Sequence, residues 1–143
     1  MNDDDRAWVH AVRRPPTPKK RSGTTPEAKV SNAIDRYLKQ LGFYVLRTSA
    51  GMAEIDGRKM SIGRAGTHDR TCCAPGGCYV SIEIKSAAGT PTPAQLRQKE
   101  FIERRGGLVI VARSTDDVRA ALVARFGEAT VCGWEAGHVS RMV

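Results

Sequence analysis

The segment Cys78–Ser86 constrains the fold of this chain most strongly, because its apolar and polar residues alternate. Such alternation is typical of a β-strand, in which successive side chains point to opposite faces of the sheet. One face of this strand carries Glu83 and Lys85, one strand period apart, and the opposite face is apolar. The chain therefore requires a sheet that presents a carboxylate beside an ammonium group. The apolar face of this strand, which needs a hydrophobic core, consists of Val80, Ile82 and Ile84.

Two interpretations of Glu83 and Lys85 follow from their shared face. The carboxylate can hold a divalent cation, while the lysine orients an attacking water and lowers its pKa, as phosphodiester hydrolysis requires. The alternative is an ordinary ion pair on a half-exposed strand, because Glu-x-Lys is a common tripeptide. The surrounding sequence has to decide between these interpretations.

Size and charge narrow the class of protein. The chain has 143 residues, which suits one compact domain, and a formal net charge of +8. This excess suits a polyanionic partner such as nucleic acid. No apolar run is long enough to cross a bilayer, and the N-terminus lacks the pattern of a signal peptide. We therefore expect a cytoplasmic protein that does not bind membranes.

The cysteines favour core packing over a metal site. Cys72, Cys73 and Cys78 lack the paired C-x-x-C spacing of structural zinc sites, and Cys132 is remote. Adjacent cysteines in a strand point to opposite faces of the sheet. We expect free thiols that act as small apolar side chains.

Residues 1–25 are predicted to form a flexible basic arm before the domain at 26–126. The segment 13–21 contains five basic residues, three prolines and no acid, so it cannot build a core. It either follows a phosphate backbone or remains a solvated tail. Residues 127–143 form a C-terminal extension of unknown packing, in which Trp134 either packs on the core or joins an oligomer interface.

The first predicted helix runs from about Pro26 to Leu41, with Thr24 or Thr25 as its N-cap. Glu27 lies at the head of its apolar stripe, which is unusual for an acid. One explanation is a capping box formed with Thr24. The other is that Glu27 points over the sheet toward a cation.

The remaining pattern predicts an alternation of strands and helices. Asp69 and Glu83 fall at neighbouring ends of a predicted hairpin, so the two acids could share one metal ion. Residues 49–67 are expected to form a loop. The Gly- and Pro-rich turn at 75–77 joins the two strands of the hairpin. The other predicted elements are strands at 43–48, 68–74 and 108–112 and helices at 92–105 and 114–126.

This order of elements, with its polar marks, resembles the PD-(D/E)xK nuclease superfamily, most of all its small VRR-NUC branch, which is related to Holliday-junction resolvases. The resemblance covers roughly residues 26–124. It implies an α/β, restriction-endonuclease-like αβββαβ core with a central four-stranded mixed sheet flanked by helices. The motifs that carry it are GTHD at 66–69, YVSIEIKS at 79–86, TPAQ at 92–95 and GGLVIVARSTDDV at 106–118.

The resemblance implies a metal site. Asp69 and Glu83 would bind Mg²⁺ or Mn²⁺, with the backbone carbonyl of Ile84 as a third ligand. Lys85 would position or activate the attacking water. Glu27 would hold a second cation or a water on the metal.

Two further residues receive roles from the resemblance. Gln95 would orient Lys85 or contact the substrate phosphate. His68 replaces the proline of the family motif before Asp69, and we favour a structural role for it over an active-site role.

The implied function is a metal-dependent endonuclease that hydrolyses DNA, with specificity for junctions, flaps or other branched structures. A homo-oligomer, dimeric or larger, is expected because cutting both strands usually needs two sites. One alternative is a catalytically inactive nucleic-acid-binding module on the same fold. A second is a basic binding protein unrelated to nucleases, which the scarcity of aromatic residues disfavours for single strands.

Overall fold

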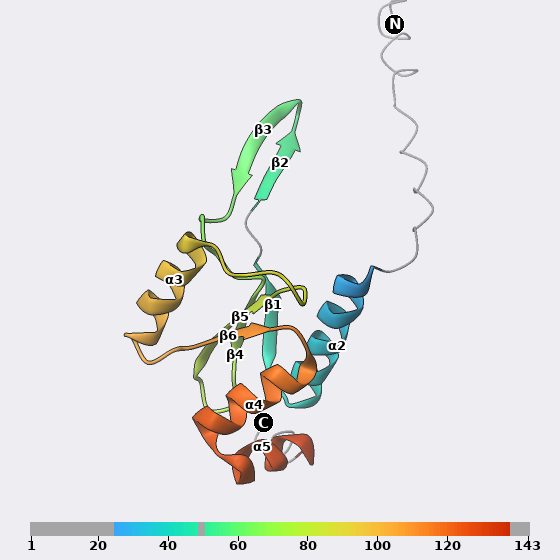
Figure 1. Cartoon of the computed structure of the whole chain (residues 1–143), viewed down its shortest axis with the longest axis vertical. Helices are drawn as coiled ribbons and strands as arrows, with labels where there is room; N and C mark the ends of the chain where they lie inside the picture. The colour runs from blue at the N-terminus through green and yellow to red at the C-terminus, as the bar shows by residue number, and fades with distance from the viewer. Residues whose placement is uncertain (1–24, 49–50, 138–143) are drawn as a thin grey trace, which may run out of the picture.

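A four-stranded mixed sheet forms the centre of the protein in a computed structural model that describes residues 25–48 and 51–137 (Figure 1). The strand order is β1-β4-β5-β6, with antiparallel pairing except between β5 and β6, which are parallel. The predicted αβββαβ core is therefore confirmed. The strands are β1 (Tyr44–Arg47), β4 (Arg70–Cys73), β5 (Tyr79–Ile84) and β6 (Leu108–Ala112).

Helices cover both faces of the sheet. The α2 helix lies against the face that carries Arg70 and Ile82, which are paired across β4 and β5. The α3 helix lies against the opposite face, where its Gln95 contacts Glu83. The helices are α2 (Pro26–Gln40), α3 (Pro93–Glu103), α4 (Thr115–Phe126) and α5 (Glu128–Glu135).

The β5 strand is buried on both faces, so the sequence-based alternative of a half-exposed strand is wrong. Val80 and Ile82 are fully inaccessible, and Ser81 and Glu83 on the other face are only 2% and 3% exposed. Burial of an ionisable side chain at this level needs compensation by charge or hydrogen bonds. The main core is completed from the helices by Ile34, Leu38, Leu41, Val118, Leu122, Val131 and Trp134.

The C-terminal extension contributes to this core. The Trp134 ring lies edge-on to Phe43 and Phe126, with centroid separations of 5.5 and 5.0 Å. Such edge-to-face pairs add to the free energy gained from burial of the rings. Of the two alternatives for Trp134, packing on the core is confirmed.

The expectation of a loop at 49–67 is wrong, because the chain forms a hairpin of β2 (Gly51–Ile55) and β3 (Arg58–Ile62). Asp56 and Gly57 both have positive φ, 51° and 74°, as the two central residues of a tight hairpin turn require. The Asp-Gly pair was the signal for this hairpin, and the surrounding Gly, Arg and Lys residues obscured it. The hairpin projects away from the sheet (Figure 1).

Other expectations changed at the level of single residues. The strand predicted at 68–74 begins at Arg70, and Thr25 rather than Thr24 is the N-cap of α2. Cys72 is buried and Cys73 exposed, as adjacent strand residues should be, and all four cysteines are free. Burial raises the pKa of the Cys72 thiol to about 12.

No helix among the described residues is long and apolar enough to span a membrane. The basic arm lies outside the described residues.

Candidate active site

The centre of the candidate site is the carboxylate of Glu83, near the end of β5. Its Oε1 accepts hydrogen bonds from Lys85 Nζ at 2.8 Å and from Gln95 Nε2 at 2.6 Å. Its Oε2 is buried and has no hydrogen-bond partner within the described part of the chain. A buried oxygen in this state lowers the stability of the fold, so it indicates a position suited to bind another group. The predicted ion pair therefore exists, but it satisfies only one side of the carboxylate.

A capping box on α3 fixes the amide that meets Glu83. Thr92 is the N-cap, and its hydroxyl accepts from the Gln95 backbone N–H. In return, Gln95 Oε1 accepts from the Thr92 backbone N–H at 2.8 Å. This leaves Nε2 of Gln95 to donate to Glu83. The Gln95 side chain thus holds the Glu83 carboxylate. Gln95 and Lys85 are linked through Glu83 Oε1, which accepts a hydrogen bond from each of them.

Asp69 lies beside Glu83, as the predicted hairpin required. The pairing of Arg70 with Ile82 places Asp69, one residue before β4 begins, opposite Glu83. Asp69 Oδ2 accepts a hydrogen bond from the backbone N–H of Ile84 at 2.9 Å. The acid is thereby held against the strand that carries Glu83.

A cleft of about 300 Å³ brings Glu27 to the same neighbourhood. Thr25 accepts from the backbone N–H of Ala28, so the capping box considered for Thr24 and Glu27 is wrong. Glu27 instead lines the cleft together with Asp69 and Ile84, whereas Glu83 and Lys85 are not among its lining residues. The cleft is also lined by Thr25, Ala28, Ser31, Arg47 and Arg70.

The donor set fits a hard divalent cation. Glu83 Oε2 lacks a hydrogen bond from any described residue, and Asp69 supplies a second carboxylate next to the neighbouring strand β4. No group of three or more His, Cys, Asp or Glu side chains within residues 25–48 and 51–137 could hold a metal by itself. Magnesium is commonly held by one or two carboxylates while it retains several waters. Asp69 and Glu83 are therefore the residues that could hold a cation of this kind.

Lys85 combines an anchored backbone with a partly accessible side chain. Its backbone N–H donates to the carbonyl of Ala112 at 3.0 Å, which extends the pairing of β5 and β6. Its side chain is 18% exposed, against 4% for the side chain of Glu83. The ammonium group therefore lies between the buried acid and solvent, where it can meet an incoming anion.

His68 is engaged in the structural contacts that we favoured for it. The ring is buried, with Nδ1 2.7 Å from Ser81 Oγ and Nε2 3.2 Å from the Gln95 carbonyl. Both ring nitrogens have partners, so the side chain ties β5 to α3. It supports Gln95 from the backbone side.

A second buried acid, which sequence reasoning missed, lies on the other face of the sheet. Asp35 of α2 accepts hydrogen bonds from Arg70 through both oxygens, at 2.7 and 3.1 Å, and from Arg47 at 2.9 Å. Burial raises the pKa of Asp35, but the hydrogen bonds and charges of Arg70 and Arg47 outweigh burial and leave it below its ordinary value. Arg70 Nη1 also donates to the carbonyl of Asp69 at 2.9 Å. Asp35 lies beside the apolar stripe of α2, and its partner Arg70 is 35 positions away, so the sequence contains no local signal for the pair.

The comparisons with known proteins agree with this architecture. A solved structure described as a VRR_NUC domain matches with a TM-score of 0.52 and 26% sequence identity, over 71% of this chain and 98% of that chain. No protein-family model and no curated protein matches the chain. The resemblance to the VRR-NUC branch that the sequence predicted is confirmed, and it indicates a nuclease-type domain.

Proposed function

We propose that this protein is a Mg²⁺- or Mn²⁺-dependent endonuclease that hydrolyses DNA phosphodiesters. The observation that carries the proposal is the buried Glu83 carboxylate. One of its oxygens has no partner among residues 25–48 and 51–137, and the other is paired with Lys85. The VRR-NUC-like fold and the net charge of +8 support a polyanionic substrate at this site. We also propose branched DNA, such as a junction or flap, as the preferred substrate, and a homo-oligomer as the form that cuts both strands.

Asp69, Glu83 and the carbonyl of Ile84 would hold the cation, and Glu27, which lines the cleft with Asp69 and Ile84, would hold a second cation or a water on the metal. When bound, the metal would supply Lewis-acid stabilisation of charge on the phosphoryl oxygens. Gln95 holds the Glu83 carboxylate in one orientation through its capping-box geometry. The hydrogen bond from the Ile84 N–H likewise holds Asp69.

Lys85 positions the nucleophile in this proposal. Its ammonium group donates to Glu83 and is partly accessible, so it can orient a water molecule that enters from solvent. A positive charge beside that water also favours loss of its proton. Because the backbone of Lys85 is anchored to β6, its position relative to Glu83 is maintained.

A cleavage assay on a panel of DNA substrates tests the proposal. The panel contains a four-way junction, a flap, a nicked duplex, a single strand and a plain duplex, each with Mg²⁺, Mn²⁺ or a chelator. We expect metal-dependent cleavage, fastest on a branched substrate, and none by Glu83→Gln purified in parallel as the control for contaminating nuclease. Equal cleavage by the wild-type protein and this variant would contradict the proposal.

A further inference from the structure

One face of α3 continues into a strip of basic and aromatic side chains that the candidate active site does not use. Two cavities, of about 340 and 280 Å³, lie along this face. They share Gln98 and Phe101 in their linings, so they adjoin each other. We call this surface the α3 strip, defined by Arg64, Tyr79, Arg97, Gln98, Phe101 and Arg105.

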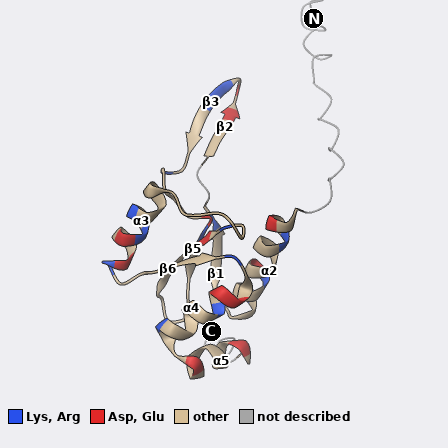
Figure 2. Ribbon diagram, viewed as in Figure 1, with Lys and Arg blue, Asp and Glu red and all other residues tan. Residues whose placement is uncertain are grey.

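The α3 strip is positively charged. No acidic residue is among those that line the two cavities in the described part of the chain. Figure 2 shows acidic as well as basic residues on α3. Its two acids, Glu100 and Glu103, form ion pairs with Arg104 and Lys99, which lie outside both linings. Polyanionic chains are therefore better partners for this face than a neutral or cationic surface.

Two exposed aromatic rings lie within the same surface. Phe101 is 49% exposed and Tyr79 is 43% exposed. The guanidinium of Arg105 lies 3.6 Å from the centroid of the Phe101 ring, which adds a cation to an aromatic face. Proteins that bind single-stranded nucleic acid combine a basic groove with aromatic rings on which unpaired bases stack. A duplex, whose bases are already stacked on one another, would leave these rings unused.

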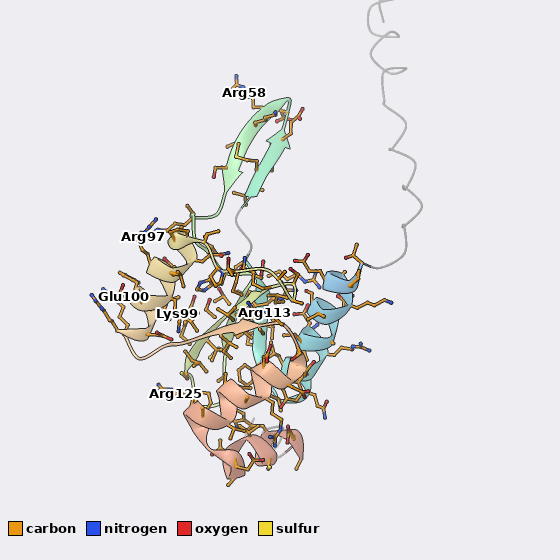
Figure 3. All side chains as sticks on the ribbon, in the orientation of Figure 1. Arg58, Arg97, Lys99, Glu100, Arg113 and Arg125 are labelled. Carbon is orange, nitrogen blue, oxygen red and sulfur yellow. The ribbon has the colours of Figure 1, made fainter. Side chains whose placement is uncertain are left out.

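The strip begins at the candidate active site. Ala94 lines the first cavity, and the next residue, Gln95, holds Glu83. A side chain at Gly66 would come within 2.5 Å of the Ala94 carbonyl oxygen, so the loop that contains Arg64 lies directly against the start of α3. Arg97 lies on α3 nearer the β2–β3 hairpin than Glu100 does (Figure 3). A strand that follows this face from Arg105 toward Arg97 therefore leads to Glu83.

We infer that the α3 strip binds a single-stranded stretch of the DNA substrate and guides it to the candidate active site. This inference rests on the proposed function. Unpaired bases stack on Phe101 and Tyr79, while the arginines neutralise the phosphates. The substrate class is accordingly DNA with an unpaired strand beside the cut, rather than a fully paired duplex.

Binding of a fluorescent oligothymidylate to the full chain, measured by anisotropy in the presence of a chelator, tests the stacking contact. We expect Phe101→Ala to weaken this binding about tenfold, a typical loss for removal of one stacking ring. The matched control is Leu96→Ala, which removes an equally exposed apolar side chain from α3 outside both cavities. Equal affinities for the two variants would overturn the inference, and so would an equal loss of duplex affinity in Phe101→Ala.

The salt dependence of the same binding gives a second readout that does not depend on the aromatic variant. Arg97→Gln should reduce the slope of log affinity against log salt by about 0.7, the value for one phosphate contact on a single strand. Arg104→Gln removes the same charge from α3 outside the strip and should leave the slope unchanged. An equal reduction in both variants would mean that only the overall charge matters, and the strip would be rejected.

Two further measurements separate this inference from its alternatives. Light scattering should give the same mass for the wild-type protein and Phe101→Ala; a lower mass for the variant would make the strip an interface between copies of this chain and overturn the inference. Glu83→Gln should lose cleavage but keep its oligothymidylate affinity. If the wild-type protein cleaves DNA but Phe101→Ala keeps its oligothymidylate affinity, only the role of the α3 strip is rejected. If Phe101→Ala loses oligothymidylate affinity selectively but the wild-type protein does not cleave DNA, only the nuclease proposal is rejected.

Discussion

The two buried acids of the central sheet, Asp35 against one face and Glu83 on the other, differ in how their charges are compensated. Asp35 accepts hydrogen bonds on both oxygens from Arg70, and Arg47 adds a third contact. Glu83 has both of its partners on one oxygen, while the other oxygen is buried without any within the described residues. A fully compensated acid stabilises a fold. An acid with one free oxygen costs stability and is suited to bind something else.

This contrast assigns Asp35 to the stability of the fold and Glu83 to the proposed activity, although both contact the same sheet. Arg70 connects the two regions, because it pairs with Asp35 and also donates to the carbonyl of Asp69. The network around Asp35 therefore supports the backbone on which the candidate metal ligands lie. Variants of Asp35 should affect unfolding first, whereas variants of Glu83 should affect chemistry first.

The largest expected effect is on cleavage by Glu83→Gln. This change should lower single-turnover cleavage at least about a thousandfold, because it removes the charge proposed to hold the metal. The unfolding free energy should change by less than about 1 kcal/mol, since a neutral amide no longer has to bury an incompletely paired charge. Chemical denaturation and quenched-flow cleavage measure the two quantities. A variant that unfolds readily but still cuts would reverse the contrast with Asp35.

The next largest effect is expected for Lys85→Ala. Single-turnover cleavage should fall at least about a hundredfold, which is the scale for loss of a positioned acid–base or electrostatic group. DNA affinity in Ca²⁺ should change by less than about tenfold, because a group that acts on the chemical step contributes little to ground-state binding. Near-normal cleavage at saturating DNA would make Lys85 a binding residue and remove it from the proposed mechanism.

Asp35→Asn should produce the opposite outcome. We expect destabilisation of about 3 to 5 kcal/mol, because Arg70 keeps its charge in a site where its side chain is only 5% exposed. Urea denaturation measures the loss, and Arg47→Gln is the matched control because its side chain is 67% exposed. The control should lose less than about 1 kcal/mol. Similar losses for both variants would show that the compensation at Asp35 is not specific to the buried arginine.

Low pH should remove the contribution of Asp35 to the unfolding free energy. Its pKa in the folded protein lies below the ordinary value of 3.8, so its contribution to stability is complete above that value and is lost as the pH falls through the folded pKa. The difference in unfolding free energy between the wild-type protein and Asp35→Asn should therefore shrink below about pH 4. Denaturation curves across the acid range measure it, and a constant difference would exclude the charge as its cause.

The two acids also differ in how far the sequence could predict them. Glu83 was predicted because its environment is local: strict alternation places it with Lys85, and a four-residue capping motif places Gln95. Asp35 and Arg70 are 35 positions apart, and their pairing depends on how α2 crosses β4. A single sequence carries no local signal for such a contact.

The rest of the fold follows this division only in part. The order of helices and strands along the chain followed from apolar runs and turns, and the four-stranded mixed sheet from the family resemblance. The β2–β3 hairpin was missed although Asp56-Gly57 provides a local turn signal. The helix at Glu128–Glu135 was also missed, because Gly127, with φ of 89°, separates it from α4 and its own pattern is short. The α3 strip depends on a loop, a helix and the start of a strand, so only the folded arrangement brings it together.

Calorimetric titration with Mn²⁺ tests the central claim, a cation site formed by Asp69 and Glu83, most directly. The wild-type protein and the control Glu100→Gln should both bind Mn²⁺, because Glu100 pairs with Arg104 on α3 and lies outside the candidate site. Glu83→Gln and Asp69→Asn should each weaken binding at least about tenfold, since each removes one of the two carboxylates. Unchanged Mn²⁺ affinity in both of these variants would contradict the site and the nuclease mechanism built on it.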